Sequence, residues 1–193
     1  MLSKMNNSTT STANVLSECL IQKILCHLSY KEAIKNSAND LIFGGPTFTL
    51  YPLPIFKILA TTPLRELDLS FCNLKCVSLS SGVFANCHSL RKLSLTFVLL
   101  DENMLQTLLN SCPLIVSFVL KCCSGLEKIE LLNLQKIKSV SISKAGNQRV
   151  KIQASTLEHL SYNGHGPEEL DVVECHNLKS LDLSHVAISD GFL

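Results

Sequence analysis

The sequence predicts an α/β solenoid, in which short parallel strands stack side by side and few helices lie between them. Three observations support this fold class. A motif with leucine at fixed positions begins at Leu64, it recurs at a near-constant interval, and apolar residues alternate with polar ones inside each copy. Alternation with a period of two is typical of a strand with one buried face. A single unit of this kind cannot bury its apolar face alone, so neighbouring copies must stack.

The first copy is Leu64-Arg65-Glu66-Leu67-Asp68-Leu69-Ser70-Phe71-Cys72-Asn73-Leu74. It fits the leucine-rich-repeat pattern L-x-x-L-x-L-x-x-C/N-x-L at every fixed position. The second copy runs from Leu90 to Leu100, and the third begins at Ile115. The first strand leucine, Leu67, is followed 26 residues later by Leu93 and a further 25 residues later by Phe118. Both intervals lie in the range of roughly 20–29 residues that leucine-rich repeats show.

Beyond the third copy, most candidate strands lie only ten or eleven residues apart. They are Ile129-x-Leu131, Val140-x-Ile142, a strand near Val150–Ile152, Leu160-x-Tyr162, Leu170-x-Val172 and Leu181-x-Leu183. Ten residues can hold a strand and a tight return, but not a strand together with a three-turn helix. We therefore expect the second half of the solenoid to have irregular short repeats, rich in strand and poor in helix.

One helix is expected from Asp101 to about Asn110. Asp101 is a suitable N-cap, because its carboxylate can accept a hydrogen bond from a free amide of the first turn. The apolar residues at helical spacing are Met104, Leu105, Leu108 and Leu109. Cys112 precedes Pro113, and the residue before a proline is driven out of the helical region. A second helix is expected to begin near Ser189, where the run from Ala187 repeats the pattern after Leu99 and then stops.

Composition and charge exclude several classes of partner. The chain has 193 residues, 46% of them apolar and 17% charged, with a net charge of +1. The sequence has no cluster of lysine and arginine residues, so it does not predict a nucleic-acid partner. Residues 41–56 are uncharged, but glycines and prolines interrupt them and they are shorter than the roughly 20 residues of a membrane span. We expect a loop there and no membrane partner. The absence of an apolar core from residues 1–14 argues against a signal peptide and predicts a location in the cytoplasm, the nucleus or both.

Nothing in the sequence predicts a catalytic, metal or cofactor site. The nine cysteines include no two pairs at zinc-finger spacing, and buried free thiols are the favoured interpretation. We find no Ser/His/Asp or Cys/His arrangement and no glycine-rich phosphate loop. We therefore expect an interaction protein that is not an enzyme. The alternative, a hydrolase that uses one cysteine, predicts a single hyper-reactive thiol with a depressed pKa.

The segment from Leu16 to Ala33 is expected to form an amphipathic helix, with Ser29 as the cap of a second short helix from Tyr30. Its sequence resembles the start of an F-box in the plant form L-P-x-x-x-I-x-x-I-L-x-x-L-S-x-K-E-A, with Ser17 in place of the proline. The chain as a whole resembles plant F-box/leucine-rich-repeat proteins. The likeness to the F-box ends after Ser37, and the tryptophan signature of its third helix is absent, so the F-box is incomplete.

The resemblance implies a role in ubiquitin transfer. In that family the F-box docks on the Skp-type adaptor of a cullin-RING ubiquitin ligase, and the repeats hold a protein substrate. The positions that match the apolar adaptor contacts are Leu16, Ile21, Ile24, Leu25 and Leu28. The alternative is a leucine-rich-repeat interaction scaffold outside any ligase, or a truncated product whose F-box does not function.

The predicted organisation has four parts. Residues 1–14 form a disordered N-terminus, 15–37 the helices of a partial F-box, 38–60 a linker, and 61–193 leucine-rich repeats truncated at the C-terminal end. In stacked L-x-L strands, the interleaved residues face solvent on the concave side. The candidate partner-binding residues are Glu66, Asp68, Lys92, Ser94, Val119, Lys121, Lys128, Glu130, Ser141, His159, Asp171 and Asp182. This surface lacks the arginine and aromatic anchors of strong hot spots, and a solvated face without a partner is the alternative.

Overall fold

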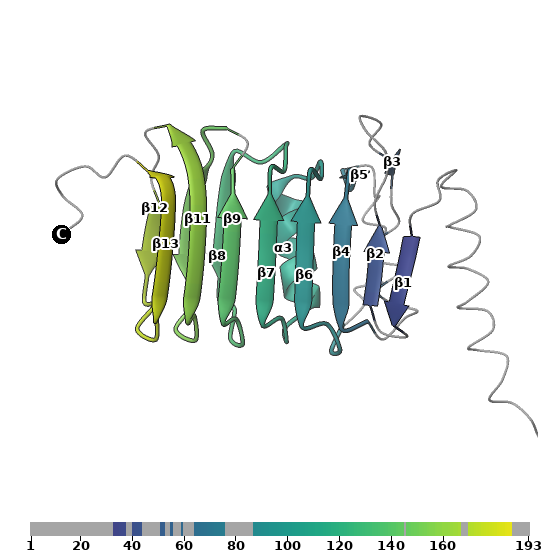
Figure 1. Ribbon diagram of the computed structural model, residues 1–193, viewed down its shortest axis with the longest axis horizontal. Helices are drawn as coiled ribbons and strands as arrows, with labels where there is room; N and C mark the ends of the chain where they lie inside the picture. The colour runs from purple at the N-terminus through teal and green to yellow at the C-terminus, as the bar shows by residue number, and fades with distance from the viewer. Residues whose placement is uncertain are drawn as a thin grey trace, which may run out of the picture. The chain divides into compact units, whose positions relative to one another are not determined.

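A large parallel sheet runs through the described part of the chain. The computed structural model describes residues 33–37, 40–43, 51–52, 55, 59, 64–75, 87–144, 146–166 and 170–186, all within one unit, residues 32–193. The strand order of the large sheet is β1-β2-β4-β6-β7-β9-β11-β13. Figure 1 shows these strands side by side, with helix α3 (Glu102–Ser111) behind them. The leucine-rich-repeat solenoid that the sequence predicts is therefore present.

Most strands of the large sheet are the predicted L-x-L segments. The sheet contains β1 (Ala33–Ser37), β2 (Asp40–Phe43), β4 (Glu66–Ser70), β6 (Lys92–Thr96), β7 (Ser117–Lys121), β9 (Ser139–Ser143), β11 (His159–Gly166) and β13 (Ser180–Val186). All neighbours pair in parallel except β1 and β2, which are antiparallel. In register, the apolar residue Leu67 lies opposite Leu93, which lies opposite Phe118.

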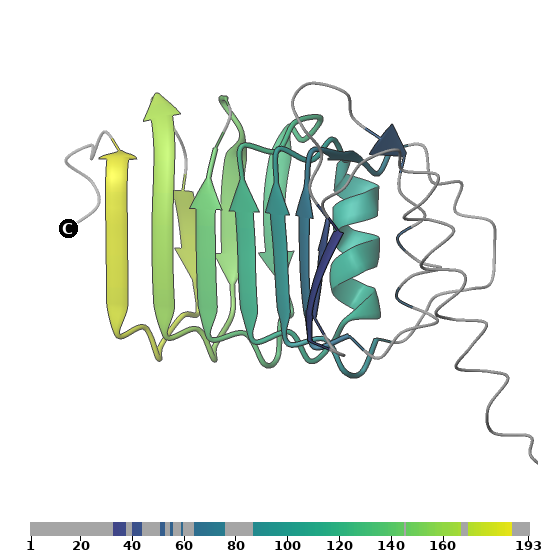
Figure 2. The same cartoon turned by 45° about the vertical axis from the view of Figure 1, so that its right-hand side comes forward.

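The remaining candidate strands form a second, smaller sheet on the other side of the core (Figure 2). It consists of β8 (Lys128–Leu132), β10 (Arg149–Gln153) and β12 (Leu170–Val173), paired in parallel in the order β12-β10-β8. From β7 onward the chain alternates between the two sheets, so an interval of ten residues is half a coil. Residues Phe118, Val140, Leu160 and Leu181 of the large sheet are 22, 20 and 21 residues apart. The repeat interval therefore stays near that of a leucine-rich repeat. In these later coils a strand of the small sheet takes the position that α3 has in the coil between β6 and β7.

A two-strand ladder lies beyond the C-terminal ends of the first large-sheet strands. Strand β3 (Tyr51–Pro52) pairs in parallel with β5 (Cys72–Asn73). The ladder continues through isolated bridges from Asn73 to Leu99 and from Leu99 to Ser124. These pairings hold consecutive coils together after the chain has turned away from the large sheet.

Helix α3 confirms the predicted helix and its cap. The Asp101 side chain accepts a hydrogen bond from the Met104 amide at 2.8 Å, and Asp101 itself has extended backbone angles, as an N-cap requires. The four apolar residues at helical spacing are all buried. The helix ends at Ser111, and Cys112 has left the helical region before Pro113.

Replacing the cap tests how far the helix depends on it. Asp101→Ala should lower the free energy of unfolding by about 1 kcal/mol, because a first-turn amide loses its acceptor. Urea denaturation followed by circular dichroism measures the change. Asp101→Asn, which keeps a capping oxygen, is the control and should cost less. Equal losses from the two variants would show that the hydrogen bond to Met104 contributes little.

The core lies between the two sheets and α3. The large sheet contributes Leu67, Leu69, Leu93, Leu95, Phe118, Leu120, Val140, Ile142, Leu160 and Tyr162, and the small sheet contributes Ile129, Leu131, Val150 and Ile152. Each of these side chains is at most 1% exposed. At the sheet edge, Leu181 on β13 continues the row of Leu160 and is 49% exposed. The residues of this apolar row are therefore buried on strands that have a neighbour on both sides, and the row becomes exposed at the edge strand β13.

Three strands lie where the sequence predicts other structure. Ala33–Ser37 forms β1, so the prediction of F-box helix up to residue 37 is wrong for these residues. Asp40–Phe43 forms β2 and Tyr51–Pro52 forms β3, so the linker predicted over 38–60 is wrong there too. The physical reason is register: the apolar segment after Asp40 pairs with β4, which places Leu41 opposite Leu67. The predicted helices before residue 33, the N-terminus and the helix near Ser189 lie outside the described residues.

Candidate interaction surface

The exposed side of the large sheet is the surface on which the repeats could bind a partner. We define the outer face as the side chains of β4, β6, β7, β9, β11 and β13 that point away from the core. The strand register arranges them in three rows. The first is Glu66, Lys92, Ser117, Ser139, His159 and Ser180; the second is Asp68, Ser94, Val119, Ser141, Ser161 and Asp182; the third is Ser70, Thr96, Lys121, Ser143, Asn163 and Ser184. Ten of these side chains are serine or threonine.

The structure brings together nine of the twelve residues predicted for the concave face. These are Glu66, Asp68, Lys92, Ser94, Val119, Lys121, Ser141, His159 and Asp182. Placing Lys128, Glu130 and Asp171 on the same face was wrong, because β8 and β12 belong to the small sheet. The cause is the half-coil interval: strands ten residues apart alternate between the sheets, so their interleaved residues face opposite directions. The five predicted adaptor-binding residues lie outside the described residues.

Charges on the outer face are only partly compensated. The Lys92 ammonium lies 3.0 Å from the Glu66 carboxylate on the neighbouring strand. At the far edge, the Ser161 hydroxyl donates a hydrogen bond to the Asp182 carboxylate at 3.3 Å. Within the described part of the chain, the side chains of Asp68 and Lys121 form no ion pair or hydrogen bond. No other described residue therefore neutralises the charges of these two side chains.

An ion network stands where the strands begin. The Glu158 carboxylate lies 2.9 Å from the Lys138 ammonium and 2.7 Å from the Lys179 ammonium. Hydrogen bonds from the two lysines, that of Lys179 first, lower the pKa of Glu158 to about 2. The same three residues are joined through their backbones, since the Glu158 amide donates to the Lys138 carbonyl and the Lys179 amide to the Glu158 carbonyl. This network links three neighbouring coils. Its one carboxylate and two ammonium groups leave a net charge of +1.

Sequence reasoning missed an aromatic pair where the strands end. Phe71 follows β4 and Phe97 follows β6, and their rings stack with centroids 5.0 Å apart at an interplanar angle of 12°. Phe97 is 46% exposed. Both residues have left-handed backbone angles, φ +56° and +52°, which are rare for bulky side chains. The available signal was the recurrence of phenylalanine at the same position in two consecutive copies of the motif.

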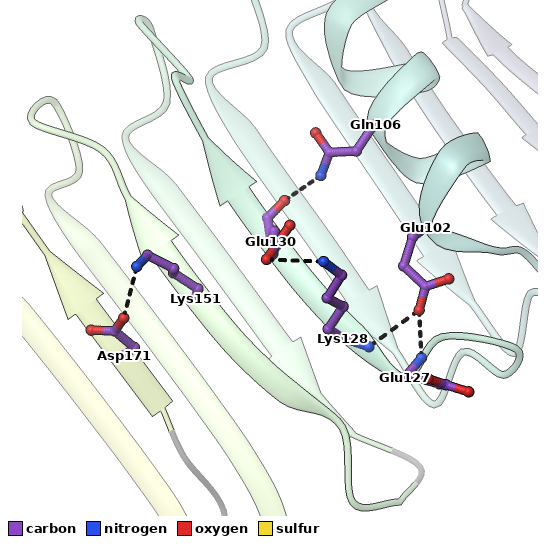
Figure 3. Close-up of polar contacts among 7 residues, drawn as sticks. All are labelled: Glu102, Gln106, Glu127, Lys128, Glu130, Lys151 and Asp171. Atoms are coloured by element: carbon purple, nitrogen blue, oxygen red, sulfur yellow. Dashed lines mark hydrogen bonds and ion pairs between the residues drawn. The ribbon is translucent and has the colours of Figure 1, made fainter.

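On the exposed side of the small sheet, lysines form ion pairs with carboxylates of the same sheet (Figure 3). The Lys128 ammonium lies 3.4 Å from the Glu130 carboxylate, and the Lys151 ammonium lies 3.2 Å from the Asp171 carboxylate. A hollow of about 180 Å³ between α3 and β8 is lined by Glu102, Asn103, Leu105, Gln106, Lys128 and Glu130. The polar groups around it bind one another, so this side offers a partner few free charges.

Side chains of α3 cover the open edge of β8. The Glu102 carboxylate accepts hydrogen bonds from the amides of Glu127 and Lys128 at 2.7 and 3.2 Å, and the Glu127 bond is the main cause of its lowered pKa. The Gln106 amide donates to the Glu130 carbonyl at 2.6 Å (Figure 3). An uncovered strand edge invites pairing with another chain. These contacts therefore serve the fold and leave the outer face as the candidate site.

Four of the described cysteines, Cys72, Cys87, Cys112 and Cys123, are buried core residues, while Cys122 and Cys175 are half-buried. Burial raises the pKa of the Cys72 and Cys123 thiols to about 11. A hydrogen bond between Cys87 and Cys112 lowers the pKa of the first and raises that of the second, and both side chains are at most 6% exposed. In the described part of the chain, no three His, Cys, Asp or Glu side chains gather as metal ligands. None of the helices described there combines the length and apolar character needed to cross a bilayer.

Comparison with known proteins agrees with the fold. Residues 26–172 match the family model described as "FBD-associated F-box protein At5g56370, LRR repeats". No curated protein and no solved structure matches the chain. The match begins before residue 33, in agreement with the position of β1 and β2 in the repeat sheet. The chain therefore belongs to the family of leucine-rich repeats found in FBD-associated F-box proteins.

Proposed function

We propose that this protein is a substrate-recognition subunit of a Skp-cullin-F-box ubiquitin ligase. The observation that carries the proposal is the match of residues 26–172 to the repeats of an F-box protein. In the proposed arrangement, the outer face binds a protein substrate, and the apolar residues Leu16, Ile21, Ile24, Leu25 and Leu28 contact a Skp-type adaptor. Such a role places the protein in the cytoplasm or the nucleus.

The outer face supports a binding role on physical grounds. Its serine and threonine side chains are short, so a partner can approach the sheet closely and form hydrogen bonds along three straight rows. Asp68 and Lys121 add charges that nothing in the described part of the chain neutralises. The small sheet has the opposite character, because its ion pairs are internal. A protein partner therefore gains more binding free energy on the outer face than on the small sheet.

A second candidate is an interaction scaffold that does not join a ligase. The observation that favours it is the position of β1 and β2. Residues 33–43 contribute strands to the repeat sheet, and they lie where the end of an F-box is expected along the sequence. Residues committed to the sheet cannot also complete the small helical core of an F-box, and helical domains below about 40 residues seldom fold unaided.

Adaptor binding decides between the two candidates. The full chain should co-purify with a Skp-type adaptor, and Ile24→Asp should weaken the complex at least ten-fold, because a carboxylate replaces an apolar contact. The matched control is Gln22→Asp, which makes the same charge change on the polar side of the predicted helix and should bind normally. Absence of binding at micromolar concentration would leave the scaffold as the function.

A further inference from the structure

Two charged side chains of the outer face, which have no ion-pair partner among the described residues, belong to strands near a partly exposed aromatic pair. We define the β4–β7 patch as Asp68, Ser94, Lys121, Phe71 and Phe97. Asp68 and Lys121 lie on the flanking strands β4 and β7, with β6 between them. Neither side chain has an ion-pair partner in the described residues, while Glu66 nearby is occupied by Lys92. The patch therefore presents a negative and a positive charge at separate, fixed positions.

Backbone hydrogen bonds fix the aromatic pair at the ends of β4 and β6. The Phe97 amide donates to the Lys121 carbonyl at 2.9 Å, and the Phe71 amide donates to the Thr96 carbonyl at 3.1 Å. Each ring follows directly after the last residue of its strand, so the pair stands at the end of β4 and β6. A rigid, partly exposed aromatic pair is the kind of group that contributes most to protein–protein affinity.

Ser94 lies at the centre of the patch. In register it lies between Asp68 and Val119. The residue is only 7% exposed, and its hydroxyl has no hydrogen-bond partner among the described residues. A hydroxyl so placed can donate to or accept from a bound group. Ser70 and Thr96, in the next row, also carry short hydroxyl side chains.

We propose that the β4–β7 patch binds an extended segment of a protein partner with a basic, an aromatic and an acidic residue on one face. The basic residue pairs with Asp68, the aromatic ring packs on Phe97, and the acidic residue pairs with Lys121. The two charges are two strands and one row apart, or roughly 12 Å at strand spacings of about 4.8 Å. An extended segment covers this distance in about four residues, and its residues i, i+2 and i+4 share a face.

This inference rests on the proposed role of the outer face, and short peptides test it. The probe is a fluorescein-labelled ten-residue peptide with Arg-Ser-Phe-Ser-Glu at its centre, titrated with the full-length chain at low ionic strength while anisotropy is recorded. It should bind at least ten-fold more tightly than the same peptide with serine in place of phenylalanine. Phe97→Ser in the protein should remove the same ten-fold preference. Salt should weaken binding, because the pairs are exposed.

A matched pair of charge reversals locates the site. Asp68→Lys should lower the affinity at least ten-fold and favour a peptide with Glu-Ser-Phe-Ser-Glu at its centre. Asp171→Lys makes the same change on β12 of the small sheet, outside the outer face, and should leave the affinity unchanged. Thermal unfolding of each variant checks that the fold persists. Equal effects of the two reversals, or no preference for phenylalanine, would overturn the proposal. If the adaptor still co-purifies with the chain in that case, the ligase role survives and only the patch is excluded.

Discussion

Phe118→Ala should lower the free energy of unfolding by about 3–5 kcal/mol, the range observed when a buried phenylalanine is truncated. The Phe118 side chain is 0% exposed and lies in register between Leu93 and Val140, at the centre of the large sheet. In a solenoid each coil is stabilised mainly by its two neighbours. A cavity at this position therefore weakens the contacts of β7 with both the coil before it and the coil after it.

Urea denaturation followed by circular dichroism measures this change. Val119→Ala is the control, because the adjacent residue points to the outer face and is half-buried, so its truncation should change stability by roughly 0.5 kcal/mol or less. A separate transition for each half of the chain in Phe118→Ala would show that the cavity uncouples the coils. Similar small losses in both variants would contradict the placement of Phe118 in the core.

The first half of the fold was predictable because its signal is local. Leu67, Leu93 and Phe118 recur at an interval that allows one strand and one helix per coil, and Asp101 marks the start of that helix. In the second half the same reasoning found the strands but not their sheets. Alternation at Ile129 looks like alternation at Val140, because each strand has one buried face whichever sheet it joins. Which sheet a strand joins depends on how the chain turns between consecutive strands. The sequence of a single strand does not contain that information.

The sequence likewise predicts some features of the candidate site and not others. Asp68 and Lys121 follow from the L-x-L pattern, since an interleaved residue of a large-sheet strand faces outward. That neither has an ion-pair partner among the described residues depends on which side chains the register brings beside them. The stacking of Phe71 on Phe97 depends on left-handed backbone angles at both residues, which β-strand propensity does not predict. These features arise from three-dimensional packing.

Gly125→Ala should destabilise the protein by about 2–3 kcal/mol, because two effects add at this position. Gly125 has φ +88°, a conformation that side chains other than glycine adopt with strain. A Cβ atom there would also lie 2.5 Å from the Leu100 carbonyl oxygen and 3.1 Å from the Leu99 side chain. Backbone hydrogen bonds fix this carbonyl's surroundings, since the Leu100 amide donates to the Ser124 carbonyl at 3.0 Å. The clash therefore cannot be relieved by rotating a side chain.

Gly146→Ala is the matched control for this substitution. A Cβ atom at Gly146 would meet nothing within 4 Å, and this glycine is not in the left-handed region. The same chemical change should therefore alter the free energy of unfolding by no more than roughly 0.5 kcal/mol. Chemical denaturation of both variants gives the comparison. Because Gly125 closes the turn between β7 and β8, a loss confined to Gly125→Ala would show that the change from large sheet to small sheet depends on glycine at this turn. Equal stability of the two variants would mean that the backbone there relaxes freely, and the turn would then not fix which sheet the next strand joins.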